Sequence, residues 1–431
     1  MESFGGDDGA DDIATIGSDL ISSMNNIVPE NSLLSTKCCI FATPKLLLKD
    51  NEKSYLPTAF AIGPVHHGKP DLQEAEQIKL KYTRDLIARV SEWNDTIVKD
   101  LVKEIASLEE QARQYYAVPV KFNKAKFVKL LLVDGCFIIE LFRKRLGDSP
   151  IYEDDPVCGR PFLREVLGTD LLLLENQIPW MVLDRLFSST TRTGALSLTQ
   201  VTLSFFSFLR TGGLDLQTEN SFMLSTLDQS KHVLELLRNS LVWSTIPEGG
   251  ELDTWELIPS ASSLTEAGVK FKKGSTSNGL LDIKFSNGVL EIPPLVIVEP
   301  TKAFFRNLIS YEQCYHWCHP KITSYAMLLD LLINTSKDMD ILCENGIIQN
   351  WLNPEDATQI FNNLYNDTNV SHFYYLELCR EVNKYCKRRW PRWRAMYVRN
   401  HFSSPWAIAS QVLAAIIFIL TLLQTVFSIK S

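Results

Sequence analysis

The sequence lacks the short motifs that identify most enzymes. It has no G-x-S-x-G nucleophile elbow, no Walker loop and no Rossmann glycine pattern. It is therefore not typical of an α/β-hydrolase, a P-loop nucleotidase or a dinucleotide-dependent dehydrogenase. We predict no catalytic, cofactor-binding or metal-binding residue, and we expect a protein that is not an enzyme.

Positive charge is also scarce. The chain has 43 Lys and Arg against 51 Asp and Glu, a net charge of −8, and seven of the cations lie between Lys384 and Arg399. The rest of the chain then carries 36 − 51 = −15. Nucleic-acid binding needs a basic face, so this composition excludes it. The nine cysteines are scattered and odd in number, which favours reduced thiols over a disulfide framework.

The last stretch, residues 405–429, lacks charged side chains altogether. At ~1.5 Å per residue, a helix from Trp406 to Phe427 is long enough to cross a hydrocarbon core of ~30 Å. We predict a single C-terminal transmembrane helix, with the lipid bilayer as a partner. The alternative is a buried C-terminal helix, favoured by four polar side chains within the stretch: Gln411, Thr421, Gln424 and Thr425.

The chain also begins without a recognisable secretory signal, because Asp7, Asp8, Asp11 and Asp12 stand where a basic region is required. The cations from Lys384 to Arg399 flank the predicted span, and basic flanks stay in the cytosol. We therefore expect a single-pass membrane protein with a cytosolic body. Sequons at Asn94, Asn334, Asn366 and Asn369 would carry glycan only on a luminal body.

Apolar periodicity predicts a mainly α fold. Residues 1–35 form an acidic flexible arm, and residues 36–400 form one helical domain with a possible boundary at 188–250. Apolar stripes at helical spacing follow residues 75–90 and 97–115. Lys126 to Arg145 is apolar nearly all round, and Thr169-Asp170 is expected to cap a further apolar helix that Pro179 kinks or restarts.

One short segment changes to strand spacing. Leu281, Ile283 and Phe285 alternate with polar residues, Asn287-Gly288 follows, and residues 289–298 are rich in β-branched side chains. Asn-Gly between such runs is typical of a hairpin, and Gly288 should need a positive φ. We predict a small β-hairpin sheet within the helical body.

The informative polar residues interrupt apolar helices: Asp134 in one, and Glu175, Asn176 and Gln177 in another. Carboxylates rarely sit in a core without a partner. Either these groups form a general acid and base pair, or they form a buried network that joins two helices, with Arg143 or Arg185 as counter-ion. The absence of a nucleophile motif favours the structural alternative, and both remain open.

Histidines and cysteines offer two further candidate sites. His66-His67 lies in a Pro and Gly rich turn, and a structural role is favoured over a ligand or base. Cys314 and Cys318 are spaced i, i+4 on an expected helix beside Glu312, His316 and His319. Two thiolates and two imidazoles would suit zinc, but the helical spacing places His316 away from both cysteines, so ordinary helix residues are favoured.

Several strings together resemble the plant domain-of-unknown-function 247 family. The resemblance covers about residues 37–427. The strings follow in order: CCIFATPKLL with Tyr55-Leu-Pro57, IGPVHHGKPDLQEAEQIKLKY, VDGCFIIELF, DLLLLENQIPW, PSASSLTEAGVKFK, NGVLEIPPL, FRNLISYEQC and the PW at 405–406. Ala61 departs from the family pattern, and the acidic arm lies outside it. The resemblance implies a plant protein with one C-terminal span, and some grass members are associated with self-incompatibility.

Two classes of function follow. The first is a membrane-anchored interaction or recognition protein, for example of self-incompatibility type, which needs a protein partner and no catalytic residue. The alternative is a membrane-tethered enzyme with an unrecognised active site. A broad exposed apolar patch would favour the first, and a deep polar pocket with a perturbed carboxylate would favour the second.

Overall fold

The computed structural model describes the chain in segments. The described residues are 15, 18–22, 24, 37–49, 51–90, 95–151, 155–191, 196–209, 221–242, 256–276, 279–315, 317–370, 372–387 and 405–430. The chain divides into two compact units: unit 1 is Met1–Thr202 with Ser230–Leu234, and unit 2 is Leu203–Gln229 with Glu235–Ser431. Most of the predicted arm, and residues 192–195, 210–220 and 243–250 of the predicted boundary region, lie outside the described residues.

Unit 1 is helical in its described part. Its elements are α2 (Lys45–Leu48), η2 (Glu52–Ser54), η3 (Pro70–Leu72), α3 (Glu74–Val90), α4 (Asp95–Arg113), α5 (Lys124–Leu146), α6 (Pro161–Asp170), α7 (Trp180–Thr190) and the first part of α8 (Leu198–Phe205). Residues 230–234 add the start of α10 (Val233–Leu241).

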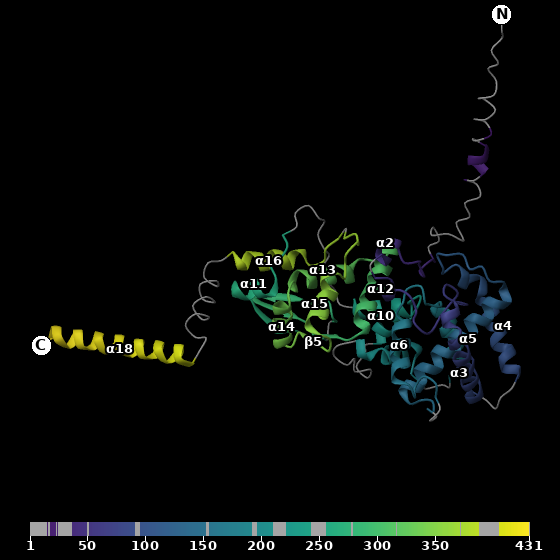
Figure 1. Ribbon diagram of the computed structural model, residues 1–431, viewed down its shortest axis with the longest axis horizontal. Coiled ribbons are helices and arrows are strands. Elements are labelled where there is room, and N and C mark those ends of the chain that lie inside the picture. Colours follow the sequence, from purple (N-terminus) through teal and green to yellow (C-terminus); the bar gives the residue numbers. More distant parts are fainter. Residues whose placement is uncertain are drawn as a thin grey trace, which may run out of the picture. The chain divides into compact units, whose positions relative to one another are not determined.

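Helix α5 is the centre of unit 1. It packs against α3 and α4 (Figure 1) and against α7. It is buried along most of its length because it is apolar nearly all round. The Asn123 side chain caps its first turn by accepting from Lys126 N at 2.9 Å. Gly147 ends it in a left-handed conformation (φ 80°), directly after the cations of the last turn. The prediction of helices over 75–90, 97–115 and 126–145 is confirmed.

The stretch around Glu175, Asn176 and Gln177 is not the predicted helix. α6 ends at Asp170, and the chain runs through a buried connection to α7, which restarts at Trp180 with Pro179 at its N-cap. The Asn176 amide donates to Asp170 O at 2.9 Å, and the Gln177 amide donates to Leu171 O and Leu173 O at 2.8 and 2.9 Å. Side-chain amides thus satisfy carbonyls that a continuous helix would have bonded, which is why apolar spacing alone misled the prediction.

Unit 2 combines helices with short strands. Its helical elements after α8 are η4 (Ser207–Leu209), α9 (Ser221–Leu227), most of α10, α11 (Ala261–Glu266), α12 (Pro300–Cys314), α13 (Lys321–Leu332), α14 (Ser336–Glu344), α15 (Pro354–Asn362), α16 (Leu376–Cys386) and α18 (Pro405–Lys430). Its strands are β1 (Lys270–Lys273), β2 (Lys284–Ser286), β3 (Val289–Ile292), β4 (Leu295–Ile297) and β5 (Ile348–Asn350).

The predicted hairpin is confirmed by antiparallel β2 and β3, in which Phe285 pairs with Leu290. Asn287 and Gly288 both have positive φ, 51° and 79°, as the turn requires. β1 adds to β3 in parallel, giving the order β1-β3-β2. The predicted second run breaks at Pro293-Pro294, after which β4 pairs with β5, a parallel pair that the sequence did not indicate.

The C-terminal residues form helix α18, but the prediction of a transmembrane helix over 405–429 is wrong. Within the part of the chain that the structure describes, no helix is both long and apolar enough to cross a membrane. Within α18, the Thr421 hydroxyl donates to Ile417 O and the Thr425 hydroxyl to Thr421 O, both at 2.8 Å.

The predicted localisation depended on that helix and is corrected with it. A single-pass protein anchored at its C-terminus conflicts with the lack of any spanning helix among the described residues. The basic flank that set the predicted orientation is described only at Lys384 and Lys387, and its remaining cations lie outside the described residues.

Candidate functional site

Asp134 of α5 lies in the interior of unit 1, paired with a lysine. Its side chain is 1% exposed, and its carboxylate accepts from Lys79 Nζ at 2.6 Å and from Gly63 N at 2.8 Å. Lys79 of α3 also donates to Ala61 O at 2.8 Å. The counter-ion is therefore neither Arg143 nor Arg185, which the sequence had suggested. This contact joins α3, α5 and the 59–63 segment.

Burial alone would lower the pKa of Lys79. The carboxylates of Asp134 and Glu76 more than offset this, so the pKa of Lys79 is raised and its ammonium stays charged. Both oxygens of Asp134 are occupied by donors in a closed interior. A carboxylate held in this way is a structural partner, and it lacks the free oxygen that a general base needs.

Asn176 and Asp170 hold the same segment from the other side. Asn176 accepts from Ile62 N at 2.7 Å and donates to Phe60 O at 2.9 Å. Asp170 accepts from three consecutive backbone N–H groups, those of Thr58, Ala59 and Phe60, at 2.8 to 2.9 Å. Burial raises the pKa of Asp170 to about 6, although the three N–H groups act in the opposite direction. The sequence suggested Asp170 only as a helix cap and missed this role.

His66 and His67 point to different carboxylates. His66 is 3% exposed, with Nε2 3.4 Å from Glu175 Oε2, and its pKa is lowered to about 4 by burial and then by Lys69. Glu175 accepts from Thr43 N at 2.7 Å, so it too serves a backbone contact. His67 Nδ1 lies 3.8 Å from Glu76 Oε1. A buried neutral His66 favours a structural role in the turn over proton transfer with a dissolved substrate.

The residues considered for zinc do not share one helical face. α12 ends at Cys314, and Cys318 and His319 lie in the connection to α13, while His316 lies outside the described residues. Burial raises the pKa of Cys318 to about 12, which opposes the thiolate that zinc requires. Among described residues, no group of three or more His, Cys, Asp or Glu is placed to hold a metal ion.

Glu312, from the same string, has a different partner within unit 2. It accepts from Arg238 Nη2 at 2.7 Å and from the backbone N–H groups of Ile322 and Thr323 at 3.0 and 2.8 Å. It therefore fixes the start of α13 to α10 rather than serving as a ligand.

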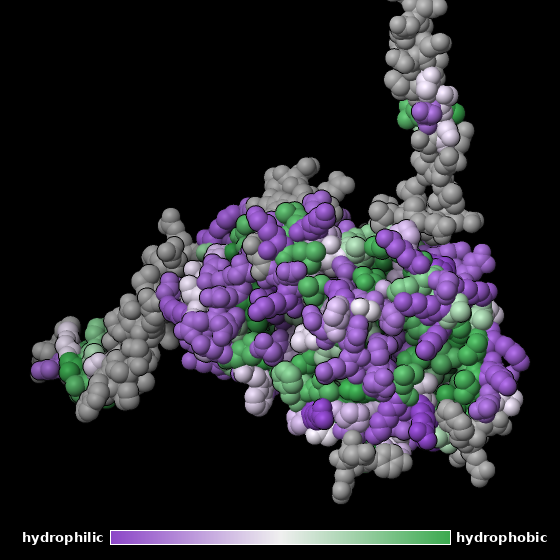
Figure 2. All heavy atoms as spheres, turned by 45° about the vertical axis from the view of Figure 1, so that its right-hand side comes forward, coloured by the Kyte–Doolittle hydropathy of each residue, from purple (hydrophilic) through white to green (hydrophobic). Residues whose placement is uncertain are grey.

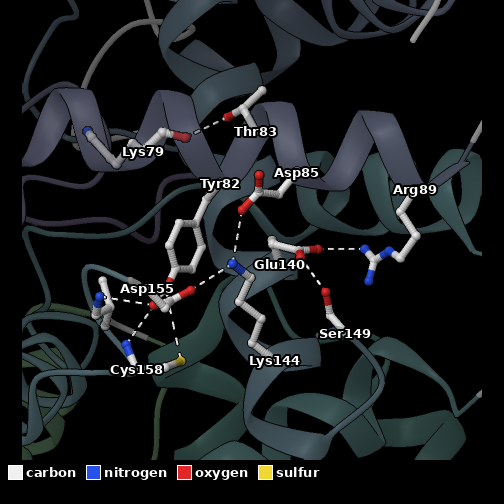
Figure 3. A network of polar contacts seen from close by, with 11 residues as sticks. Lys79, Tyr82, Thr83, Asp85, Arg89, Glu140, Lys144, Ser149, Asp155 and Cys158 are labelled. Atoms are coloured by element: carbon white, nitrogen blue, oxygen red, sulfur yellow. Dashed lines mark hydrogen bonds and ion pairs between the residues drawn. The ribbon is translucent and has the colours of Figure 1, made fainter. Parts of the chain in front are cut away.

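Two further groups of polar contacts join the helices of unit 1, as Figure 3 shows. Lys144 donates to Asp85 and Asp155 at 3.0 and 2.8 Å, and Asp155 also accepts from the Tyr82 hydroxyl at 2.6 Å. One turn away, Glu140 accepts from Arg89 at 2.5 Å. The polar groups shown between α3 and α5 therefore bond to one another. The outer faces of these helices are left as the surfaces that could bind a ligand or a partner.

An apolar groove lies on one such face, between α3, α4 and α5. It has a volume of about 660 Å³, within the usual range of ligand sites. Its apolar lining comes from all three helices: Leu80 and Ile87 of α3, Val98, Val102 and Ala106 of α4, and Ala125, Val128, Leu132 and Val133 of α5. Leu80 and Val102 are 43% and 41% exposed. In Figure 2, hydrophobic residues gather on the right-hand side, where Figure 1 places these helices.

Positive charge borders the groove. Arg84, Lys124 and Lys129 line it, and all three are exposed. Within the described residues, none of them has a carboxylate at ion-pair distance, unlike Lys79 and Lys144 between the same helices. On a chain with a net charge of −8, this is a local excess of positive charge beside an apolar surface.

The sequence contained a signal for this groove that the prediction missed. Val98, Val102 and Ala106 recur every four residues, as a second stripe beside the buried Leu101 and Ile105. Two apolar stripes on one helix indicate either a second packing partner within the fold or an exposed apolar face. Only the structure shows that these residues face a groove.

Comparison with known proteins gives matches over most of the chain. A family model described as a plant protein of unknown function, DUF247, matches residues 40–420. The Arabidopsis thaliana UPF0481 protein At3g47200 is 27% identical over 91% of this chain and 87% of its own length. The putative UPF0481 protein At3g02645 of the same plant is 22% identical over 93% of this chain and 92% of its own length. No solved structure matches.

Proposed function

Since the chain belongs to the plant family DUF247, we propose that it is an interaction protein whose groove between α3, α4 and α5 binds an acidic amphipathic helix of a partner protein. The observation that carries this proposal is an exposed apolar groove bordered by cations that lack carboxylate partners among the described residues. The proposal confers no catalytic role on the chain. Recognition of self-incompatibility type would be one use of such a groove.

The apolar lining supplies the affinity. Apolar surface removed from water contributes roughly 25 cal/mol per Å², so side chains such as Leu80 and Val102 gain free energy when a partner covers them. Three helices, α3, α4 and α5, line the groove. An amphipathic helix binds to a groove between helices through residues at i, i+3, i+4 and i+7.

The charged border supplies the selectivity. Arg84 belongs to α3, whereas Lys124 and Lys129 belong to the start of α5, so cations border the groove from two helices. A helix with acidic residues beside its apolar stripe would neutralise them, and a basic helix would be repelled. Charge complementarity therefore favours an acidic partner.

Catalysis has less support within the described residues. Asp170, whose pKa is raised, and Asp134, which pairs with the buried Lys79, are the two candidate carboxylates. Both accept hydrogen bonds from backbone N–H groups of the 58–63 segment. Neither lines the groove. The groove itself offers Thr83 and its cations as polar groups, which suits binding better than acid and base chemistry.

The test compares two designed fluorescent peptides by anisotropy. Both form a sixteen-residue helix with the same leucine stripe; one has glutamates beside the stripe, and the other has lysines. We expect the glutamate peptide to bind the full chain at least tenfold more tightly. Replacing all three bordering cations by glutamate should reverse this preference. Equal binding of both peptides, or no binding of either, would overturn the proposal.

The groove itself is tested by Val102→Asp, because Val102 is 41% exposed and a polar residue there should not disturb folding. Val118→Asp is the matched control, since Val118 is 45% exposed and does not line the groove. We expect at least tenfold weaker binding of the glutamate peptide for Val102→Asp only. Oleate is added in a separate titration to test for a lipid occupant. If oleate binds the native chain more weakly after Val102→Asp and the glutamate peptide does not bind at all, the occupant is a lipid and the proposal is wrong.

A further inference from the structure

A second cavity in unit 1 differs from the groove in its chemistry. It has a volume of about 580 Å³ and lies where α5, the end of α7 and the start of α8 meet the end of α3. One part of its wall carries two guanidinium groups, those of Arg89 and Arg143. The other part is apolar, with Phe187, Leu196 and Val201. This cavity shares no lining residue with the groove and is independent of the proposed function.

Arg143 is a buried cation that has no acidic partner at ion-pair distance among the described residues. It is 7% exposed, and its guanidinium donates to Thr190 O at 3.1 Å and to the Thr191 hydroxyl. It also lies 4.9 Å from the centre of the Phe187 ring. Within the described residues, no carboxylate lies at ion-pair distance from it. A buried charge normally has a partner of opposite charge, and Arg143 lacks one among these residues.

The charged groups near Arg143 do not form an ion pair with it. Arg89 lies near enough to oppose the charge of Arg143, and the pKa of Arg143 is lowered to about 10 by burial first and by Arg89 next. Glu140 is a buried carboxylate that attracts Arg143, but it is occupied by Arg89 at 2.5 Å and by the Ser149 hydroxyl at 2.5 Å (Figure 3). Asp148 lines the cavity, but it is exposed, so water screens its attraction for Arg143.

The hydroxyl groups of the wall are also occupied. The Thr190 hydroxyl donates to Leu186 O at 2.7 Å, and the Ser189 hydroxyl donates to Glu104 at 2.6 Å. The Thr191 hydroxyl accepts from Arg143 and keeps its own hydrogen for a ligand. The guanidinium N–H groups remain the charged donors of the wall, and such groups bind a carboxylate through two parallel hydrogen bonds. Phe187, Leu196 and Val201 would contact an apolar body attached to it.

We propose that this cavity is a binding site for a small organic acid, with its carboxylate on Arg143 and Arg89 and its apolar body against Phe187, Leu196 and Val201. Inorganic phosphate would leave the apolar wall uncovered, and a neutral ligand would leave the cation of Arg143 unpaired. The two guanidinium groups and the apolar wall therefore favour a carboxylate on an apolar body. Asp148 also lines the cavity, but it is exposed, so water screens its repulsion of such a ligand.

Isothermal titration of the full chain with benzoate, benzamide and inorganic phosphate tests this selection. Benzoate and benzamide have nearly the same shape and differ in charge. We expect benzoate to bind at least tenfold more tightly than benzamide, and phosphate to compete weakly with it. Equal affinities for benzoate and benzamide, or tighter binding of phosphate than of benzoate, would overturn the proposal.

Leu196→Glu assigns the binding to this cavity. Leu196 is 40% exposed and lines the cavity, so a glutamate there places a competing carboxylate without burying a new charge. Leu46→Glu is the matched control, because Leu46 is 56% exposed in the same unit and outside the cavity. We expect Leu196→Glu to weaken benzoate binding at least tenfold and Leu46→Glu to leave it unchanged. If Leu196→Glu binds benzoate as the native chain does, the proposed site is wrong.

Discussion

The ammonium of Lys79 lies 2.6 Å from the carboxylate of Asp134, and the two side chains are 0% and 1% exposed. The residues are 55 positions apart in the chain and join α3 to α5. Each also holds the backbone of the 59–63 segment, Lys79 through Ala61 O and Asp134 through Gly63 N. The pair therefore holds three pieces of chain in one place. The sequence indicated a buried network at Asp134, but neither its partner Lys79 nor its contact with the 59–63 segment.

The first prediction concerns this pair. Lys79→Met should lower the free energy of unfolding by ~3–5 kcal/mol, because it leaves a buried carboxylate without its cation. Asp134→Ala should have a similar effect. The double variant should lose clearly less than the sum of the two, with a coupling of at least ~1.5 kcal/mol. Urea denaturation measures all three.

The exposed pair Lys103 and Asp100 provides the control. Its side chains are 78% and 57% exposed, so Lys103→Met should change stability by no more than ~0.5 kcal/mol. Additive losses at Lys79 and Asp134 would show that the two residues act independently and that the network described here is wrong.

The second prediction concerns the hairpin turn at Gly288. Its φ is 79°, and a Cβ there would lie 2.3 Å from the hydroxyl oxygen of Tyr385. Gly147 has a similar φ of 80° and no atom within 4 Å of an added Cβ. Gly147→Ala should therefore cost only the strain of the left-handed conformation, ~1 kcal/mol, whereas Gly288→Ala should cost more.

Tyr385→Ala distinguishes the two contributions at Gly288. In that background, Gly288→Ala should cost about as much as Gly147→Ala, because the clash is removed. Thermal unfolding of the four variants decides this. If Gly288→Ala lowers stability by the same amount in the native chain and in the Tyr385→Ala background, the clash with Tyr385 is not the cause.

The sequence allowed prediction of what depends on local spacing. The stripes of α3 and α4, the apolar helix α5 and the Asn287-Gly288 turn all have signals within a few residues, and all were found. The partner of Asp134 was not found, because contact between Lys79 and Asp134 depends on how α3 packs against α5. The apolar groove was missed for the same reason, since three helices contribute to it.

Two errors have a different cause. Residues 171–179 were expected to be helical because four leucines precede Glu175, and apolar spacing does not reveal that Asn176 and Gln177 bond the backbone in place of a helix. The uncharged stretch at the C-terminus was taken as a transmembrane helix from its length and lack of charge. Composition alone did not establish that this helix spans a membrane, and no helix among the described residues is long and apolar enough to do so.

The last prediction concerns pH and His66. The pKa of His66 is lowered to about 4 in the folded chain, from an ordinary value of 6.5, chiefly by burial. Between pH 6.5 and 4, the unfolded chain therefore binds a proton at this residue and the folded chain does not. Stability should fall as pH decreases through this window, by up to ~3 kcal/mol from this residue.

Asp170 acts in the opposite direction, because its folded pKa of about 6 lies above the ordinary 3.8. The folded chain then binds the proton first, and stability from this residue rises as pH falls from 6 to 3.8. The total pH dependence thus mixes both effects, so the measurement compares the native chain with His66→Gln by urea denaturation at several pH values. The background from Asp170 is common to both proteins and cancels in the difference. We expect the native chain to lose stability relative to His66→Gln as pH falls from 6.5 to 4, and a constant difference across this range would show that His66 does not remain neutral in the folded chain.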